Sequence, residues 1–124
     1  MSKILIVDDD KTMTELLKTL VIMEGHTPTV VNDSTAAIEI AESVAPDLIT
    51  LDLMMPKLSG YELCELLQQD PRFVHIPVII ISARDDAESK LRALRAGAKY
   101  YITKPFDADE LMLKISELTR PRQS

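Results

Sequence analysis

Short apolar runs alternate along this chain with longer segments in which apolar residues recur at helical spacing. Five such runs occupy residues 4–7, 29–31, 48–51, 78–81 and 100–102. Most of them lack alternating polar positions, as is typical of strands that are covered on both faces of a sheet. Strands of this kind are usually parallel and need a helical crossover between them. The pattern therefore predicts a parallel sheet with helices on both sides.

The segments between and after these runs have the spacing of amphipathic helices. Residues 59–62 (Ser-Gly-Tyr-Glu) form a capping box that starts one helix, while Gly25 and Gly97 stand where helices end in a left-handed residue. The apolar positions expected to face the core are Met13, Leu16, Leu17, Leu20, Val21, Ala37, Ile38, Ala41, Leu63, Leu66, Leu67, Ala87, Leu91, Leu94, Leu111, Ile115 and Leu118.

The unit of strand followed by helix occurs five times. Because such crossovers are right-handed, we predict an α/β fold with a single doubly wound five-stranded parallel sheet and five helices on its two faces. We expect one domain over residues 1–119, and a C-terminal tail or the start of a linker over residues 120–124. Ligands of such sheets bind beyond the carboxyl ends of the strands.

Composition and charge exclude several classes of function. The chain has 124 residues, the size of one domain, and a net charge of −6, which argues against direct binding to nucleic acid or an anionic membrane. Cys64 is the single cysteine, so no intrachain disulfide can form, as is usual in the reducing cytoplasm. No apolar run approaches membrane-spanning length. These features predict a cytoplasmic domain without a membrane or nucleic-acid partner of its own.

Polar residues follow all five predicted strands. Asn32, Asp33 and Ser34, after the second strand, predict a turn and a helix cap. The polar residues after the other four strands are Asp8, Asp9, Asp10, Asp52, Ser82 and Lys104. Carboxylates at one edge of a sheet repel each other by about 4 kcal/mol per pair at ~4 Å and an effective dielectric near ~20, so a cation is needed. Lys104 is one candidate, and Mg²⁺, which prefers oxygen ligands, is the other. Carboxylate, hydroxyl, lysine and Mg²⁺ together form a phosphoryl-transfer site.

Four motifs in this order resemble a known family. Residues 7–10 (VDDD), 51–56 (LDLMMP) with Ser59-Gly60, 81–84 (ISAR), and 96–98 (AGA) leading to 104–106 (KPF) are similar to the receiver domains of response regulators in two-component systems, the CheY-like family. The resemblance covers residues 3 to about 119 without a large insertion. It implies the flavodoxin-like strand order 2-1-3-4-5.

The same resemblance implies a role for the acidic residues. Asp52 would be the nucleophile that becomes an aspartyl phosphate, and its carboxylate would also contact Mg²⁺. Asp9 would bind the ion directly, and Asp8 would hold it through water. The backbone carbonyl of Met54 would be a further ligand, so the side chain at that position need not be polar.

The remaining site residues implied by the resemblance act on the phosphoryl group. Lys104 would pair with a phosphoryl oxygen, and Ser82 would donate its hydroxyl to the group. Tyr101 would be the aromatic that rotates inward in response. The peptide bond between Lys104 and Pro105 is expected to be cis, which proline alone tolerates readily.

The function implied is a signalling switch rather than an enzyme, with self-phosphorylation and slow self-dephosphorylation as its only chemistry. The partner would be a sensor histidine kinase or a phosphotransfer protein. Output would pass through the fourth helix, fifth strand and fifth helix to an attached domain, a partner or a second copy in a homodimer. Residues 84–104 carry a net charge of +3, which leaves −9 for the rest of the chain.

Two other functions remain open from the sequence. Residues 8–12 (DDDKT) match the D-x-D-x-T signature of haloacid-dehalogenase-type phosphohydrolases, in which Asp8 would be the nucleophile. That reading leaves Asp52 without a role. The chain could also be a receiver-like interaction module that is never phosphorylated, although such variants usually lose an acid or the lysine.

Overall fold

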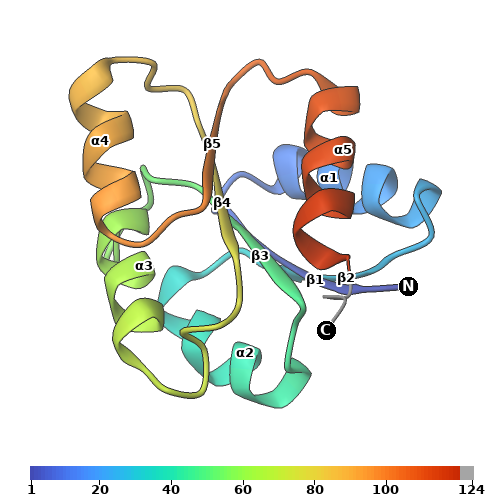
Figure 1. Ribbon diagram of the computed structural model, residues 1–124, viewed down its shortest axis with the longest axis horizontal. Coiled ribbons are helices and arrows are strands. Elements are labelled where there is room, and N and C mark those ends of the chain that lie inside the picture. The colour runs from blue at the N-terminus through green and yellow to red at the C-terminus, as the bar shows by residue number, and fades with distance from the viewer. Residues whose placement is uncertain (121–124) are drawn as a thin grey trace.

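The structure, a computed structural model, describes residues 1–120 (Figure 1). Strands and helices alternate along this part of the chain. In order they are β1 (Lys3–Val7), α1 (Lys11–Met23), β2 (Thr27–Val31), the 3-10 turn η1 (Ser34–Ala36), α2 (Ala37–Val44), β3 (Leu48–Leu51), α3 (Gly60–Gln69), β4 (Val78–Ser82), α4 (Ala87–Arg95), β5 (Tyr100–Thr103) and α5 (Ala108–Thr119).

The five strands form one sheet in the order β2-β1-β3-β4-β5, and every neighbouring pair is parallel. Helices α1 and α5 lie on one face, and α2, α3 and α4 lie on the other (Figure 1). The predicted fold class and strand order are therefore confirmed. Because β1 and β3 are adjacent, the loops that follow them meet at one edge, which we call the carboxyl edge of the sheet.

The three central strands β1, β3 and β4 bury side chains on both faces, which explains the missing polar alternation in their sequences. Residues Leu5, Ile49 and Ile80 pack toward α2, α3 and α4. Their neighbours Ile4, Leu48 and Ile79 pack toward α1 and α5. The sheet is thus a rigid aliphatic layer between two helical layers, and it fixes the positions of the loops at its carboxyl edge.

The predicted core face of α4 is wrong. Leu91 and Leu94 are 48% and 49% exposed and Ala87 is exposed, whereas Ser89 and Ala93 are buried. Both sets of residues have helical spacing, so the pattern alone does not choose between them, and side-chain size favours the wrong set. Small residues on the inner face allow α4 to pack closely against its neighbours. Two further predicted core positions are about half exposed, Leu16 and Leu66.

Helix ends follow the predicted chemistry. Ser59 and Glu62 form the capping box at the start of α3, and Gly25 and Gly97 have positive φ angles of 84° and 114°. Helix α5 ends at Thr119, and most of the predicted tail over residues 120–124 lies outside the described residues. Within residues 1–120, no helix is both long and apolar enough to cross a lipid bilayer.

One buried hydroxyl in the sheet predicts a stabilising substitution. Thr50 lies between Ile6 and Ile79 in the strand register, and its Oγ1 is the buried side-chain oxygen without a hydrogen-bond partner among the described residues. An unsatisfied buried hydroxyl costs about 1–3 kcal/mol, so Thr50→Val should raise the free energy of unfolding by about 1 kcal/mol. Chemical denaturation measures this. Thr50→Ser, which keeps the hydroxyl but loses the methyl group, should be less stable than wild type, and a destabilised valine variant would contradict the prediction.

Candidate functional site

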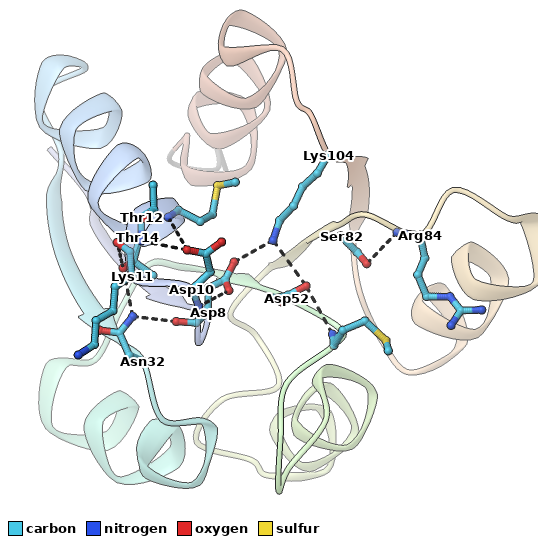
Figure 2. Close-up of polar contacts among 12 residues, drawn as sticks. Asp8, Asp10, Lys11, Thr12, Thr14, Asn32, Asp52, Ser82, Arg84 and Lys104 are labelled. Atoms are coloured by element: carbon cyan, nitrogen blue, oxygen red, sulfur yellow. Dashed lines mark hydrogen bonds and ion pairs between the residues drawn. The ribbon is translucent and has the colours of Figure 1, made fainter.

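The sheet itself positions the two most buried acids. Asp8 directly follows β1 and Asp52 directly follows β3, and their backbone N–H groups donate to Val31 and Val7, which continues the strand ladders. Asp8 is 2% exposed and Asp52 is 7% exposed. Figure 2 shows both side chains directed into the same space at the carboxyl edge, together with Lys104. Their separation is therefore set by strand pairing rather than by a flexible loop.

Three of the predicted residues form an acidic cluster. One carboxylate oxygen from each of Asp8, Asp9 and Asp52 lies within 4.8 Å of the others. Asp8 and Asp52 are buried, and Asp9 is exposed. Carboxylates this close repel each other strongly where water is scarce. The cluster therefore favours a cation, and its oxygen ligands are those that Mg²⁺ prefers.

Lys104 supplies part of the missing positive charge. Its Nζ lies 3.0 Å from Asp8 Oδ2 and 3.8 Å from Asp52 Oδ1, and its side chain is only 17% exposed. The Lys104–Pro105 peptide bond is cis, as expected. The backbone N–H of Lys104 donates to the carbonyl of Ser82, so β4 and β5 hold the lysine in place.

Burial makes Asp52 an unusual carboxyl group. Loss of solvation and, to a smaller extent, the negative charge of Asp8 together raise the pKa of Asp52 to about 6. Lys104 and the N–H of Met54, which donates to Asp52 Oδ1 at 3.4 Å, act in the opposite direction. Any positive charge added near Asp52 therefore stabilises its ionised carboxylate.

The start of α3 presses against the backbone of Asp52. A Cβ atom at Gly60 would lie 2.1 Å from the Asp52 carbonyl oxygen and 2.6 Å from Leu53 Cα. The N–H of Gly60 also donates to the carbonyl of Leu53 at 3.0 Å. Glycine at this position thus lets the helix hold the acidic loop closely. The sequence identified Gly60 as part of a helix start but gave no reason for glycine there.

Asn32 was missed as a supporting residue of the site. Its Nδ2 donates to the carbonyl of Asp8 at 2.8 Å and to Thr14 Oγ1 at 3.1 Å (Figure 2). Residues 32–34 were interpreted as a turn and a helix cap, and Asp33 does cap η1. The available signal was the position of Asn32 directly after the strand that pairs with β1.

Two other predicted residues have distinct places. Asp10 caps α1 by accepting hydrogen bonds from the N–H groups of Thr12 and Met13, so its side chain serves the helix rather than the acidic cluster. Met54 contributes its N–H to Asp52, and its side chain is exposed. Whether its carbonyl binds a metal ion stays a prediction.

Ser82 and Tyr101 are joined through the backbone of Arg84. Ser82 is fully buried, and its Oγ accepts a hydrogen bond from the Arg84 N–H at 3.2 Å. The hydroxyl of Tyr101 donates to the Arg84 carbonyl, and burial raises the pKa of Tyr101. The Arg84 guanidinium pairs with Asp86 and extends away from Asp52 (Figure 2). A movement of Ser82 would therefore reach Tyr101 through one residue, Arg84, whose backbone bonds to both.

Comparison with known proteins agrees with this fold and shows the family of the chain. The model of the family described as the response regulator receiver domain matches residues 4–116. The transcriptional regulator RpaA of Synechocystis is 36% identical over 97% of this chain and 50% of its own length. The response regulator MprA of Mycobacterium ulcerans is also 36% identical, over 95% of this chain and 50% of its own.

Solved structures give the same result. The receiver domain of a Francisella response regulator superposes with a TM-score of 0.89 at 36% identity, covering 96% of this chain and 97% of that domain. The chain belongs to the response regulator receiver domain family. It spans about half the length of the curated relatives RpaA and MprA.

Proposed function

We propose that the chain is a phosphorylation-dependent signalling switch in which Asp52 accepts a phosphoryl group from the phosphohistidine of a histidine kinase or a phosphotransfer protein in the cytoplasm. The supporting observation is that the Asp52 carboxylate lies with two other carboxylates within 4.8 Å and has Lys104 Nζ at 3.8 Å. An Asp52 oxygen attacks phosphorus, the P–N bond breaks, and the histidine nitrogen keeps the bonding electrons.

The donor set fits a bound Mg²⁺. Both oxygens of Asp8 have partners, since Oδ2 contacts Lys104 and Oδ1 accepts from the Asp10 N–H, so Asp8 suits a contact through water. Asp9 is exposed and suits a direct contact, together with Asp52 and the carbonyl of Met54. When bound, the ion would neutralise charge on the transferred phosphoryl oxygens.

The remaining residues would respond to the phosphoryl group. Lys104 would move from its carboxylate partners to a phosphoryl oxygen, and Ser82 would donate its hydroxyl to another. Ser82 would then release the N–H of Arg84, whose carbonyl holds Tyr101. Rotation of Tyr101 would thus follow from a change at Asp52, and it would be felt at α4, where Lys90 Nζ lies 6.0 Å from the centre of the Tyr101 ring.

Output through α4, β5 and α5 is supported by exposed apolar side chains on these helices, namely Leu91, Leu94 and Leu113. An attached output domain, a separate partner or a second copy could cover them. Two charged residues of α5, Glu110 and Lys114, already have partners within the chain. Tyr100 donates to Glu110 at 2.9 Å, and Lys114 Nζ lies 4.3 Å from the centre of the Tyr100 ring.

Intact mass spectrometry tests the phosphorylation. Incubation with acetyl phosphate and Mg²⁺ should add one phosphoryl group to wild type and none to Asp52→Ala, because the nucleophile is gone. Chelation of Mg²⁺ with EDTA should suppress the gain in wild type. An equal gain in mass in Asp52→Ala would contradict the assignment of Asp52 as the phosphoacceptor. Circular dichroism of that variant checks that it is folded.

A further inference from the structure

A lysine in the loop between β3 and α3 has a backbone conformation that normally favours glycine. Lys57 has a φ angle of 68°, in the left-handed region. In that region the Cβ atom of an L-residue crowds the backbone, which costs conformational strain. The side chain is exposed, so burial of the lysine stem does not offset the strain. A strained exposed residue beside a functional site calls for a reason in the chemistry of the site.

Lys57 borders a hollow that shares a residue with the acidic cluster. The hollow has a volume of about 230 Å³, and its walls are Asp9, Asn32, Asp33, Ser34, Pro56 and Lys57. Asp9 is also one of the three clustered carboxylates. The Ser34 hydroxyl donates to the carbonyl of Pro56 at 3.1 Å, which anchors the loop immediately before Lys57. The lysine therefore lines the same hollow as Asp9, beside the acidic cluster.

The charge of Lys57 is available to an incoming ligand. Among residues 1–120, ion pairs engage Lys104 with Asp8 and Asp52, but none engages Lys57. The pKa of Asp33 is lowered, chiefly by hydrogen bonds from Thr35 and to a smaller extent by the positive charge of Lys57. The Lys57 ammonium group thus attracts the Asp33 carboxylate electrostatically but forms no ion pair with it among the described residues.

Negatively charged side chains at the carboxyl edge of the sheet repel an anionic phosphodonor. Asp8 and Asp9 lie beside Asp52, and Asp33 lines the adjoining hollow, so these carboxylates repel an anion that approaches Asp52 from this side. A positive charge at the mouth of such a site raises the local concentration of anionic substrate. We propose that Lys57 is a positioning residue that draws the phosphoryl group of the donor across the acidic edge toward Asp52. The inference rests on the proposed function, since it assumes that Asp52 is phosphorylated.

The test compares initial phosphorylation rates in the presence of Mg²⁺ with acetyl phosphate and with the less negatively charged phosphoramidate. Lys57→Gly should react about fivefold more slowly with acetyl phosphate at low ionic strength, because a steering charge is lost. Lys57→Arg should stay within about twofold of wild type, because it keeps the charge. The deficit of the glycine variant should be smaller with phosphoramidate, and it should shrink in about 1 M salt, where the Debye length is only ~3 Å.

Stability separates a steering role from a structural one. Lys57→Gly removes the strained side chain, so it should resist denaturant at least as well as wild type while reacting more slowly. Lys11→Gln is the matched control, because Lys11 lies near the same edge but outside the walls of the hollow, and its side chain extends away from Asp52 (Figure 2). Its rate should match that of wild type.

Three results would overturn the inference, and they differ in whether the proposed function falls with it. If wild type gains a phosphoryl group on Asp52 and Lys57→Gly reacts as fast at every ionic strength, steering by Lys57 is wrong and the proposed function stands. A deficit that is independent of salt and of donor charge would have the same meaning. If wild type takes no phosphoryl group from either donor, the proposed function and this inference fall together.

Discussion

Lys104→Met is expected to lower the free energy of unfolding of the metal-free protein by about 3 kcal/mol, because removal of one partner from a buried ion pair leaves an uncompensated charge. The affected charges are those of Asp8 and Asp52, which lie 3.0 Å and 3.8 Å from Lys104 Nζ. The variant should also lose most of its phosphorylation rate. Urea denaturation in EDTA measures the first effect, and intact mass measures the second.

Mg²⁺ should partly repair the stability of this variant, because the ion supplies positive charge to the same carboxylates. The gain in stability on adding Mg²⁺ should therefore be larger for Lys104→Met than for wild type. Lys18→Met, an exposed lysine on α1, is the matched control and should change stability by about 0.5 kcal/mol or less. A Lys104→Met variant as stable as wild type in EDTA would show that the ion pairs do not hold the carboxyl edge together.

Asp52→Asn should stabilise the metal-free protein at pH 7. The pKa of Asp52 is about 6 in the folded protein against an ordinary value of 3.8, so the folded protein binds this proton more tightly than the unfolded chain does. Ionised Asp52 therefore weakens the fold above about pH 6, and the penalty is absent below about pH 4. The difference between pKa values of about 6 and 3.8 corresponds to about 2–3 kcal/mol, the gain expected from the neutral side chain.

The pH dependence distinguishes this effect from a change in packing. The stability difference between Asp52→Asn and wild type, measured by denaturation in EDTA, should grow from near zero at pH 4 to its full size at pH 7. Asp85→Asn replaces an exposed acid and serves as the control that should show little change. A difference that stays constant from pH 4 to pH 7 would mean that ionisation of Asp52 does not cost stability.

The sheet and its carboxyl edge could be predicted from sequence because both depend on strand burial and order. The β3 prediction over residues 48–51 matches the structure. The other strands extend further than predicted, since polar end residues such as Lys3 and Thr103 pair in the ladder although their side chains are not apolar. The core face of α4 could not be chosen, because two sets of residues have the same helical spacing.

Parts of the site that depend on contacts between side chains and neighbouring segments were harder to predict. The predicted strand order already places β2 beside β1, but the residues around Asn32 are typical of a turn, and its hydrogen bond to Asp8 is seen only in the structure. Lys57 gives no sequence signal for a left-handed backbone, since lysine is not typical of such positions. The need for glycine at residue 60 comes from the approach of α3 to the Asp52 backbone. Each of these features follows from packing between segments that are separate in the sequence or from an unusual local conformation.

The location of the phosphoryl group tests the central claim most directly. After reaction with acetyl phosphate and Mg²⁺, borohydride reduces an acyl phosphate of aspartate to homoserine, and tandem mass spectrometry of the digested protein then identifies the residue. We predict homoserine at residue 52 alone. Homoserine at residue 8 would instead support the phosphohydrolase alternative, and modification at neither position would contradict the assignment of Asp52 as the phosphoacceptor.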